Sequence, residues 1–439
     1  MLKTLVGAFK NKDIRKKILY TLMILVIVRV GSLLPIPGVD TEYFSSLLSG
    51  INTGDLSYLS AFTGGSFERM SLFALSITPY ITSSIIMQLL AIAIPKLEEM
   101  QKEGEDGRKK IAAITRYVTI ALALIESIAM AVGFGRSGLI KGYQGFSTLH
   151  YIVSIIVVVA ALTAGSAMLM WLGERITENG VGNGISIVLL INIISGMPSD
   201  FATLYSTFVA PRTIAKGVLA AAIIIAILVV MVVLVCFLQD GERRIPVQYS
   251  QKVSGRRTVG GQSTNIPLKV NTAGVMPVIF ASSLMQFPVI IAQLFGKSYE
   301  WTRYLSSSYW CRVEAPKYSI GLLVYIVLLI IFAYFYTSIT FNPIEVADNL
   351  KKAGGVIPGI TPGKSTSEYL NKILNYIVFI GAVGLLIIAL IPIMCTGFFN
   401  ASVSFGGTSI IIIVGVVLET LKQIESQMCN RYYKGFLSE

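Results

Sequence analysis

The sequence predicts an all-α polytopic membrane protein with ten transmembrane helices. Its 439 residues are 54% hydrophobic and only 14% charged, whereas about a quarter of the residues in a soluble domain are charged. The mean hydropathy is +0.71. Apolar runs of about 20 residues are long enough to cross a bilayer core. In lipid each run must satisfy its own backbone hydrogen bonds, so we expect the runs to be helices.

Ten apolar runs follow one another along the chain, separated by polar segments. They cover residues 18–34, 71–94, 117–134, 151–172, 184–205, 217–238, 271–295, 319–341, 373–393 and 406–427. The first run follows a basic segment, as the core of a signal peptide would. It is too long for one, however, and no small-residue cleavage site follows it. We therefore expect a retained span.

The distribution of basic residues predicts the orientation. If the N-terminus is cytoplasmic, the parts of the chain expected at the cytoplasmic face hold 26 of the 36 Lys and Arg residues, and the outer loops hold 8. This bias is the positive-inside rule, and with ten crossings it places both termini in the cytoplasm. A basic membrane face attracts anionic lipids by default, and it can also hold an acidic partner or RNA.

Ten spans divide into two sets of five with opposite topology, an arrangement that builds many transporters around a central site. We expect a cytoplasmic basic N-terminus at residues 1–17 and an N-terminal half at 18–215, which holds spans 1 to 5. The C-terminal half at 216–427 holds spans 6 to 10 and two cytoplasmic loops, 239–270 and 342–372. A cytoplasmic tail at 428–439 completes the chain.

Two loops have distinctive patterns. Loop 239–270 mixes charged, glycine and β-branched residues, which predicts a polar hairpin with its turn at Ser254-Gly255. The outer segment LSYLSAFTGGSFERM, Leu56 to Met70, has a short apolar face followed by Gly64-Gly65. It is too short to cross the membrane, so we expect a half-helix that folds back into the protein.

Spans 2 and 7 are unusually polar for membrane helices. Span 2 contains Pro79, Thr82, Ser83, Ser84 and Gln88, and span 7 contains Asn271, Pro277, Ser282, Ser283 and Gln286. Such side chains often bond neighbouring membrane helices together. Two of these helices in one chain also favour a seam that is lined by water or able to open. Both alternatives stay open at this point.

Known catalytic patterns are missing. The stretch GGVIPGITPGKS, Gly354 to Ser365, ends like a phosphate-binding loop. That motif needs glycine at the position of Pro358 and a preceding strand, and prolines remove backbone N–H donors. We therefore expect no nucleotide site, and no strand, in this loop. His150 is the only histidine and the four cysteines have no metal-binding spacing, so we expect no cofactor and no enzyme activity.

Three isolated side chains leave alternatives. Cys311 and Cys395 fall in predicted outer loops, where they either form a disulfide or, as we favour, remain thiols. Glu126 lies within span 3 without an evident partner. An intramembrane carboxylate is a functional candidate by default, although a proton-relay role is the less favoured alternative.

Seven stretches, in order along nearly the whole chain, resemble the SecY family, the central subunits of bacterial protein-translocation channels. They include RVGSLLPIPGVD at 29–40 and FNPIEVADNLKKAGGVIPGITPGK at 341–364, together with residues 62–90, 102–117, 170–187, 261–283 and 405–413. The resemblance implies two five-helix halves around an hourglass pore. It also implies a channel that moves unfolded preproteins across the bacterial plasma membrane, and membrane segments laterally into it.

The resemblance also assigns residues to parts of the channel. The implied pore ring is Ile77, Ile81, Ile185, Leu189, Ile279 and Ile412. The implied plug, about residues 56–67, includes Leu56, Leu59, Phe62, Gly64, Gly65 and Phe67. The implied lateral gate, between spans 2 and 3 and spans 7 and 8, includes Gln88, Ser282 and Ser283.

The implied partners are the small membrane subunits SecE and SecG, the motor ATPase SecA, the ribosome, polypeptides that carry signal sequences, and anionic lipids. Docking would use Arg256, Arg257, Lys351, Lys352, Thr361 and Lys364. Thr361 stands where the family usually has arginine. The main alternative is a secondary transporter with inverted repeats, which would need paired intramembrane charges or a polar midplane site, and the spans offer only Arg29 and Glu126.

Overall fold

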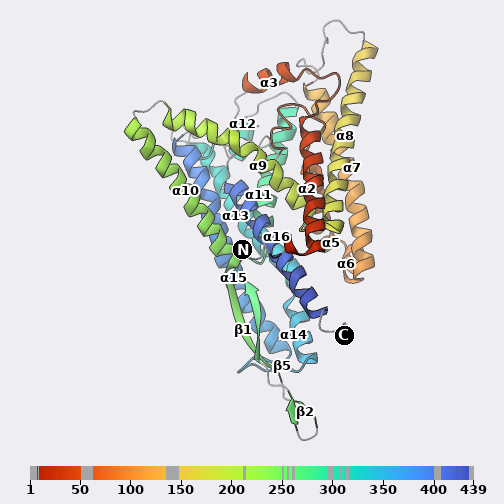
Figure 1. Cartoon of the computed structure of the whole chain (residues 1–439), viewed down its shortest axis with the longest axis vertical. Coiled ribbons are helices and arrows are strands. Elements are labelled where there is room, and N and C mark those ends of the chain that lie inside the picture. The colour runs from red at the N-terminus through yellow and green to blue at the C-terminus, as the bar shows by residue number, and fades with distance from the viewer. Residues whose placement is uncertain are drawn as a thin grey trace.

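The chain folds into long helices that lie side by side, with strands and a short helix projecting from one end (Figure 1). The computed structural model describes residues 7, 9–50, 63–134, 148–210, 214–249, 252–254, 257–259, 263–294, 300–306, 309–311, 316–399 and 407–434. The predicted all-α membrane architecture is confirmed.

Each of the ten predicted runs contains a helix. In chain order these helices are α2 (Lys12–Leu33), α5 (Thr78–Ala93), α7 (Glu105–Phe134), α8 (Thr148–Asn179), α9 (Gly184–Leu204), α10 (Ile214–Asp240), α11 (Met276–Leu294), α13 (Ile320–Thr340), α15 (Lys364–Phe399) and α16 (Gly407–Lys434). Among the described residues, six helices are long and apolar enough to cross a membrane. A seventh is added if α5 and α6 (Pro95–Lys102), which meet at a bend of 106°, form one span. The count of ten crossings stays a prediction.

Span 2 begins later than the sequence predicts. Residues 72–77 form turns instead of helix, and Ser76 has a positive φ of 53°. The first turn of α5 contains Pro79, a residue that fits a helix start because it has no N–H to bond. The backbone before α5 is held by hydrogen bonds to the end of span 1 and not by a helical turn. Leu72 N donates to the carbonyl of Leu34, and Ile36 N donates to the carbonyl of Met70. The start of span 2 is therefore tied to the end of span 1.

Three helices that begin at the polar end of the molecule share one kind of cap. The side-chain oxygens of Asn11, Asn183 and Asn342 each accept a hydrogen bond from the backbone N–H two residues later, at 3.1–3.2 Å. These caps start α2, α9 and α14 (Pro343–Lys352). Each satisfies an amide that the first helical turn leaves unpaired.

The main helix contacts fall into two groups. In the first, α8 packs on α2, α7 and α9, and α7 packs on α5. In the second, α13 packs on α11 and α15, while α10, α15 and α16 pack on one another. The groups meet along two seams, α7 with α11 and α9 with α16. The inverted relationship between the two halves stays a prediction.

A small sheet joins the two predicted cytoplasmic loops. Strand β1 (Glu242–Tyr249) pairs antiparallel with β4 (Ser263–Lys269), and at the tip β2 (Lys252–Ser254) pairs with β3 (Arg257–Val259). The predicted hairpin is confirmed, because Ser254 pairs with Arg257. The prediction that loop 342–372 contains no strand was wrong, because β5 (Gly355–Val356) pairs with the free edge of β1. A two-residue strand leaves no period to detect, and its partner lies about 100 residues earlier in the chain.

Side chains from both loops and from α15 form a small apolar core beneath the sheet. It contains Ile245, Val247, Leu268, Leu350, Ile357, Leu370, Ile373 and Ile377. The lack of a side chain at Gly355 lets β5 lie close to β1. A Cβ at this position would be 3.1 Å from side-chain atoms of both Tyr249 and Val247. The two loops therefore form one structural unit, which we call the loop unit.

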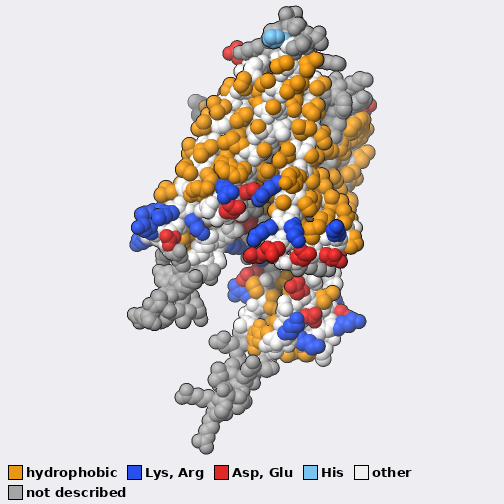
Figure 2. Space-filling model, turned by 90° about the vertical axis from the view of Figure 1, so that its right-hand side faces the viewer, with side chains coloured by type: hydrophobic (Ala, Val, Ile, Leu, Met, Phe, Trp, Pro, Cys, Tyr) orange, Lys and Arg blue, Asp and Glu red, His pale blue; other side chains and the backbone are white. Residues whose placement is uncertain are grey.

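The surface separates into an apolar and a charged part. On the face shown in Figure 2, hydrophobic side chains cover the upper and middle regions, and Lys, Arg, Asp and Glu gather in the lower part. Large side chains of α10 such as Val218, Ile225 and Phe237 are 60–76% exposed. Exposed apolar surface on this scale would drive aggregation in water, but it suits a lipid solvent.

Replacing Val247 with Asp should separate the two loops. A carboxylate in the apolar core of the loop unit costs more than about 2 kcal/mol, while the two residues of β5 contribute few hydrogen bonds to hold the sheet. We expect faster protease cleavage in both loops of the purified protein. Gln248→Asp, on the exposed face of the same strand, is the control and should cleave at the original rate. Equal cleavage of the two variants would contradict the loop unit.

Candidate functional site

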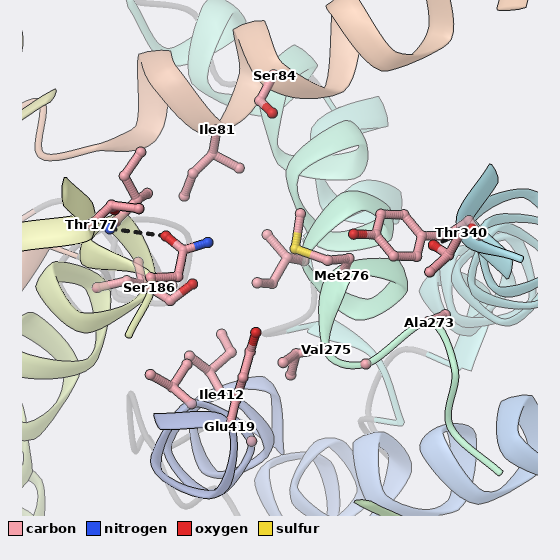
Figure 3. A pocket seen from close by; sticks show the side chains of 18 of the residues that line it. Ile81, Ser84, Thr177, Ser186, Ala273, Val275, Met276, Thr340, Ile412 and Glu419 are labelled. Atoms are coloured by element: carbon pink, nitrogen blue, oxygen red, sulfur yellow. Dashed lines mark hydrogen bonds between the residues drawn. The ribbon is translucent and has the colours of Figure 1, made fainter. Parts of the chain in front are cut away.

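A cavity of about 870 Å³ lies between the two helix groups (Figure 3). Its walls come from α5, α7 and α8, from α9 and α16, and from the turn before α11 together with α11 and α13. Charged and amide side chains, including Arg116, Glu174, Lys269, Glu419 and Lys422, line part of it, and aliphatic side chains line another part. We call this cavity the vestibule.

The structure places the six predicted ring residues in or against the large apolar core that extends through the helix bundle. Ile81, Ile185, Leu189, Ile279 and Ile412 line the vestibule. Ile77 is not on the wall, since it is 1% exposed, but it belongs to the same cluster as Leu189, Ile279 and Ile412, against which Ile81 and Ile185 also pack. They come from four separate helix regions, so only the fold brings them together.

Close packing between helices fixes part of this cluster. Gly184 opens α9, and a Cβ at Gly184 would overlap the carbonyl oxygen of Gly173 on α8. The amide of Gly184 donates to Thr177 Oγ1 at 2.9 Å, and the amide of Ile185 donates to Asn183 Oδ1 at 3.2 Å. The first turn of α9 therefore cannot slide along α8, and the side chain of Ile185 is held at the vestibule wall.

Two ion pairs cross between helices at the polar part of the vestibule. Arg116 on α7 pairs with Glu174 on α8 at 2.7 Å, and Lys422 on α16 pairs with Asp240 on α10 at 2.7 Å. Each pair lies within one helix group, so neither bridges the seams. The side chain of Glu419 points into the cavity (Figure 3). The vestibule therefore has a part of mixed charge and an aliphatic part.

The residues predicted for the plug are only partly described. Leu56, Leu59 and Phe62 lie outside the described residues. Gly64 and Gly65 have positive φ angles of 62° and 80°. Phe67 is buried and meets the ring of Phe44, on the outer helix α3 (Thr41–Gly50), edge to face at 5.9 Å.

The turn at Gly64 is placed relative to the ring by its contact with α9. Its carbonyl oxygen lies 3.4 Å from Ser195 Oγ. Ser195 follows the ring residue Leu189 by six residues, which is about 9 Å along a helix axis. The turn therefore lies beyond the ring, on the side away from the vestibule mouth.

The polar side chains of spans 2 and 7 have mixed roles. Ser83 bonds to Thr119 Oγ1 at 2.7 Å and donates to the carbonyl of Thr115 at 3.1 Å, both on α7, so for Ser83 the helix-bonding alternative is right. Ser282 is buried and donates to the carbonyl of Val278 in its own helix.

Gln88 and Ser283 fit the second alternative better. Gln88 lines the vestibule, and its Oε1 is buried without a hydrogen-bond partner in the described part of the chain. Ser283 is half-buried on α11. Among the described residues, Gln88 donates to Ser84 in its own helix, and no hydrogen bond joins it to Ser282 or Ser283.

The predicted docking residues lie on the loop unit. Arg256 is outside the described residues and Arg257 begins β3. Lys351 and Lys352 are exposed in the last turn of α14, and exposed Lys364 begins α15. Thr361 is exposed, and its carbonyl accepts from Thr366 Oγ1 at 2.9 Å. Glycines of positive φ at 359 and 363 flank it and shape a tight turn.

The described residues bear on the sequence expectations for metal ligands and cysteines. They include no group of three or more His, Cys, Asp or Glu that could hold a metal. Cys311 and Cys395 are free, which agrees with the favoured thiol alternative. Sequence reasoning missed the hydrogen bond between Arg29 and Ser195, at 2.8 Å. The sequence signal for this bond was a charged residue within span 1, and the partner lies 166 residues away along the chain.

Comparisons with known proteins agree with one another. The SecY family model matches residues 71–421. The chain is 45% identical over 445 residues to the protein translocase subunit SecY of Streptomyces scabiei, covering 100% of both chains. It is 42% identical over 447 residues to that of Halalkalibacterium halodurans, again covering 100% of both.

Two solved structures share the fold. "The structure of a protein conducting channel" gives a TM-score of 0.61 at 17% identity and covers 94% of this chain and 92% of that chain. Sec61 in the canine ribosome-channel complex from the endoplasmic reticulum gives a TM-score of 0.56 at 17% identity, with the same coverage. At this identity the structures bear on the fold alone.

Proposed function

The chain belongs to the SecY family and is a subunit of a protein translocation channel, and we propose that its apolar ring, plug segment and loop unit carry out the sealing, closing and docking steps. The observation that carries this proposal is that five aliphatic residues from four separate helices line the vestibule together. The two halves, residues 18–215 and 216–427, would move apart as a clamshell to admit a polypeptide.

An aliphatic ring suits this role because it has no preferred ligand. Isoleucine and leucine side chains offer no charge or lone pair to an ion, and a narrow apolar neck loses its water and blocks conduction. Aliphatic side chains also change rotamer at low cost, so the same ring can close around polypeptides of any sequence. Unfolded preproteins that carry signal sequences are the substrates this geometry favours.

The plug and the lateral gate complete the proposed channel. Residues 56–67 would close the pore on the outer side of the ring, which agrees with the place of Gly64 beside Ser195. The seam between α7 and α11 is where the two helix groups meet on one side. Gln88 on α5 and the pair Ser282 and Ser283 on α11 would ease the opening of this seam toward lipid, so that membrane segments leave sideways.

The partners proposed for this chain follow from the family. The small subunits SecE and SecG would stand beside it in the bacterial plasma membrane, and anionic lipids would cover the basic cytoplasmic rim. The loop unit would dock the motor SecA or the ribosome, which would supply the energy for transport. Both termini would be cytoplasmic.

The orientation can be tested with single cysteines in a background free of the four native ones. Probes at Ser254 and Gly363 should react with an impermeant thiol reagent only from the cytoplasmic side, and probes at Asn52 and Ser307 only from outside. The reason is the excess of Lys and Arg in the segments around the first pair. Mixed or reversed labelling at any position would break the assignment of spans.

The seal can be tested by ion conductance in planar bilayers. Deleting Leu56 to Gly65, or replacing both Ile81 and Ile412 with Gly, should give a folded protein that leaks, because each change removes part of the barrier to water. A matched control replaces Ile223 and Ile225 with Gly on the exposed face of α10 and should not leak. If both test variants conduct no more than the unmodified channel, the pore assignment is wrong.

Docking can be tested by transport into reconstituted vesicles. Reversing Arg256 and Arg257 to Glu should lower motor-driven transport by about tenfold or more, since hydrogen bonds to charged groups contribute about 1.5–3 kcal/mol each. Thr361→Arg should keep or raise transport, because an added donor at an exposed turn meets no steric obstacle. If the double Glu variant transports normally, or if Thr361→Arg abolishes transport, the loop unit is not the docking site.

A further inference from the structure

A second cavity, of about 380 Å³, lies where α13 ends and α14 begins beside α15. It shares no lining residue with the vestibule. Its volume is within the range of about 300–1,000 Å³ that small-molecule sites occupy. The proposed sealing, closing and docking steps do not use this cavity, which we call the interface pocket.

The lining of the interface pocket is polar but carries no charge. No Lys, Arg, Asp or Glu is among the described residues that line it, whereas three asparagines, Asn342, Asn371 and Asn375, are. The floor is apolar, because Leu374 and Val378 are buried in a small core shared by α13 and α15. A ligand of this pocket is therefore held by hydrogen bonds above an apolar floor, and not by an ion pair with the lining.

Side-chain amides are the polar groups that the lining leaves for a ligand. The hydroxyls of Thr337 and Ser338 donate to carbonyls of their own helix, at 2.8 and 2.7 Å. That of Tyr334 lies 3.4 Å from the carbonyl of Asn375. In the described part of the chain, no hydrogen bond engages the side chains of Asn371 and Asn375, which are exposed four residues apart on one face of α15. Each amide has two N–H donors and an acceptor oxygen.

The interface pocket lies at the edge of the surface that faces hydrocarbon. On α13 the exposed side chains of Val327 and Ile331 precede Ser338 by 11 and 7 residues, so the three share one stripe of the helix. On α15 the exposed Phe379 follows Asn375 by one turn. In the other direction the chain enters α14 and the charged loop unit (Figure 1). The pocket is therefore at the depth of lipid headgroups, beside a path for acyl chains.

The end of α13 adds acceptors to these donors. The last carbonyl groups of a helix have no partner within it, and they carry partial negative charge. Phe341 N takes the carbonyl of Thr337, and the carbonyls of 338–340 come after this last intrahelical bond. A ligand with both phosphate oxygens and ammonium N–H groups fits a site of this kind. An isolated ion does not, because it would lose hydration without a counter-charge.

We propose that the interface pocket binds a zwitterionic phospholipid of the phosphatidylethanolamine class. The amides of Asn371 and Asn375 donate to its phosphate oxygens, its ammonium donates to carbonyls at the end of α13, and its acyl chains lie along Ile331 and Phe379. This site differs from the attraction of anionic lipid to the basic rim, because its lining has no cation. It is independent of the proposed sealing, closing and docking steps.

The test measures lipid binding to the purified, delipidated complex by native mass spectrometry. Phosphatidylethanolamine, phosphatidylcholine and phosphatidylglycerol with identical acyl chains are compared. We expect the first to bind about tenfold more tightly than the others, because choline has no N–H to donate and phosphatidylglycerol carries a net charge that the lining does not neutralise. It should also raise the unfolding temperature, since it binds the folded state. Equal binding of the three lipids, or any other preference, would overturn the inference.

Variants of the lining test the assigned contacts. Asn371→Ala combined with Asn375→Ala should weaken the binding of phosphatidylethanolamine about tenfold, because the donors to the phosphate are lost. Ser338→Phe fills the pocket without removing an amide and should weaken binding as much. Asn349→Ala changes an exposed asparagine of α14 outside the lining and is the matched control. Unchanged binding by either folded test variant means that the pocket is not the site. If the double variant does not fold, Ser338→Phe decides alone.

Crosslinking identifies the occupant in the intact complex. A phosphatidylethanolamine with a photoreactive headgroup should attach within residues 334–343 or 371–378, and Ser338→Phe should remove this attachment. Attachment only elsewhere on the chain would place the lipid at another site and contradict the inference. If a photoreactive amino acid at Ser338 attaches instead to another protein subunit, a polypeptide fills the pocket and the inference is wrong. Lipid binding here together with failed leak and transport tests would count against the proposed channel steps alone.

Discussion

A polar path enclosed by a shell that faces hydrocarbon is the requirement on which the rest of the structure depends. Water cannot satisfy backbone groups in the bilayer core, so the shell must be helical. The same requirement sends Val218 and Phe237 outward and collects Arg116, Glu174, Asp240 and Lys422 at the vestibule. In the proposed channel it would also make the ring necessary, because a water-filled path without an apolar constriction would leak ions.

Small residues and polar bonds supply the precision that apolar packing alone does not. Lipid tails are as apolar as leucine, so packing between helices relies on close approach and hydrogen bonds. Gly184 against Gly173 and Ser83 against Thr119 hold helices within one group. Contacts of this kind inside the first group, together with the seams between the groups, would favour motion of that group as one body in the proposed channel.

The sequence predicts the helices well and the site poorly, for physical reasons. Each apolar run contains a helix because length and hydropathy are local properties. The turns at 72–77 escape prediction because the hydrogen bonds that hold their start, from Leu72 to Leu34 and from Ile36 to Met70, are tertiary. No periodicity distinguishes Ile412 from any other membrane isoleucine, so the ring came from the family resemblance. The bond from Arg29 to Ser195 joins residues 166 apart, and only folding reveals it.

The loop unit is built to act on several helices at once. Strand β1 continues from the end of α10, β4 runs into the turn that opens α11, and the loop after β5 begins α15. Because these strands share one sheet and one apolar core, a force applied to the sheet reaches three helices of the second group together. One of those three helices, α11, forms the seam with α7. In the proposed channel, a partner that displaced the sheet would move one side of the seam relative to the first group, which is the movement that the proposed lateral opening would require.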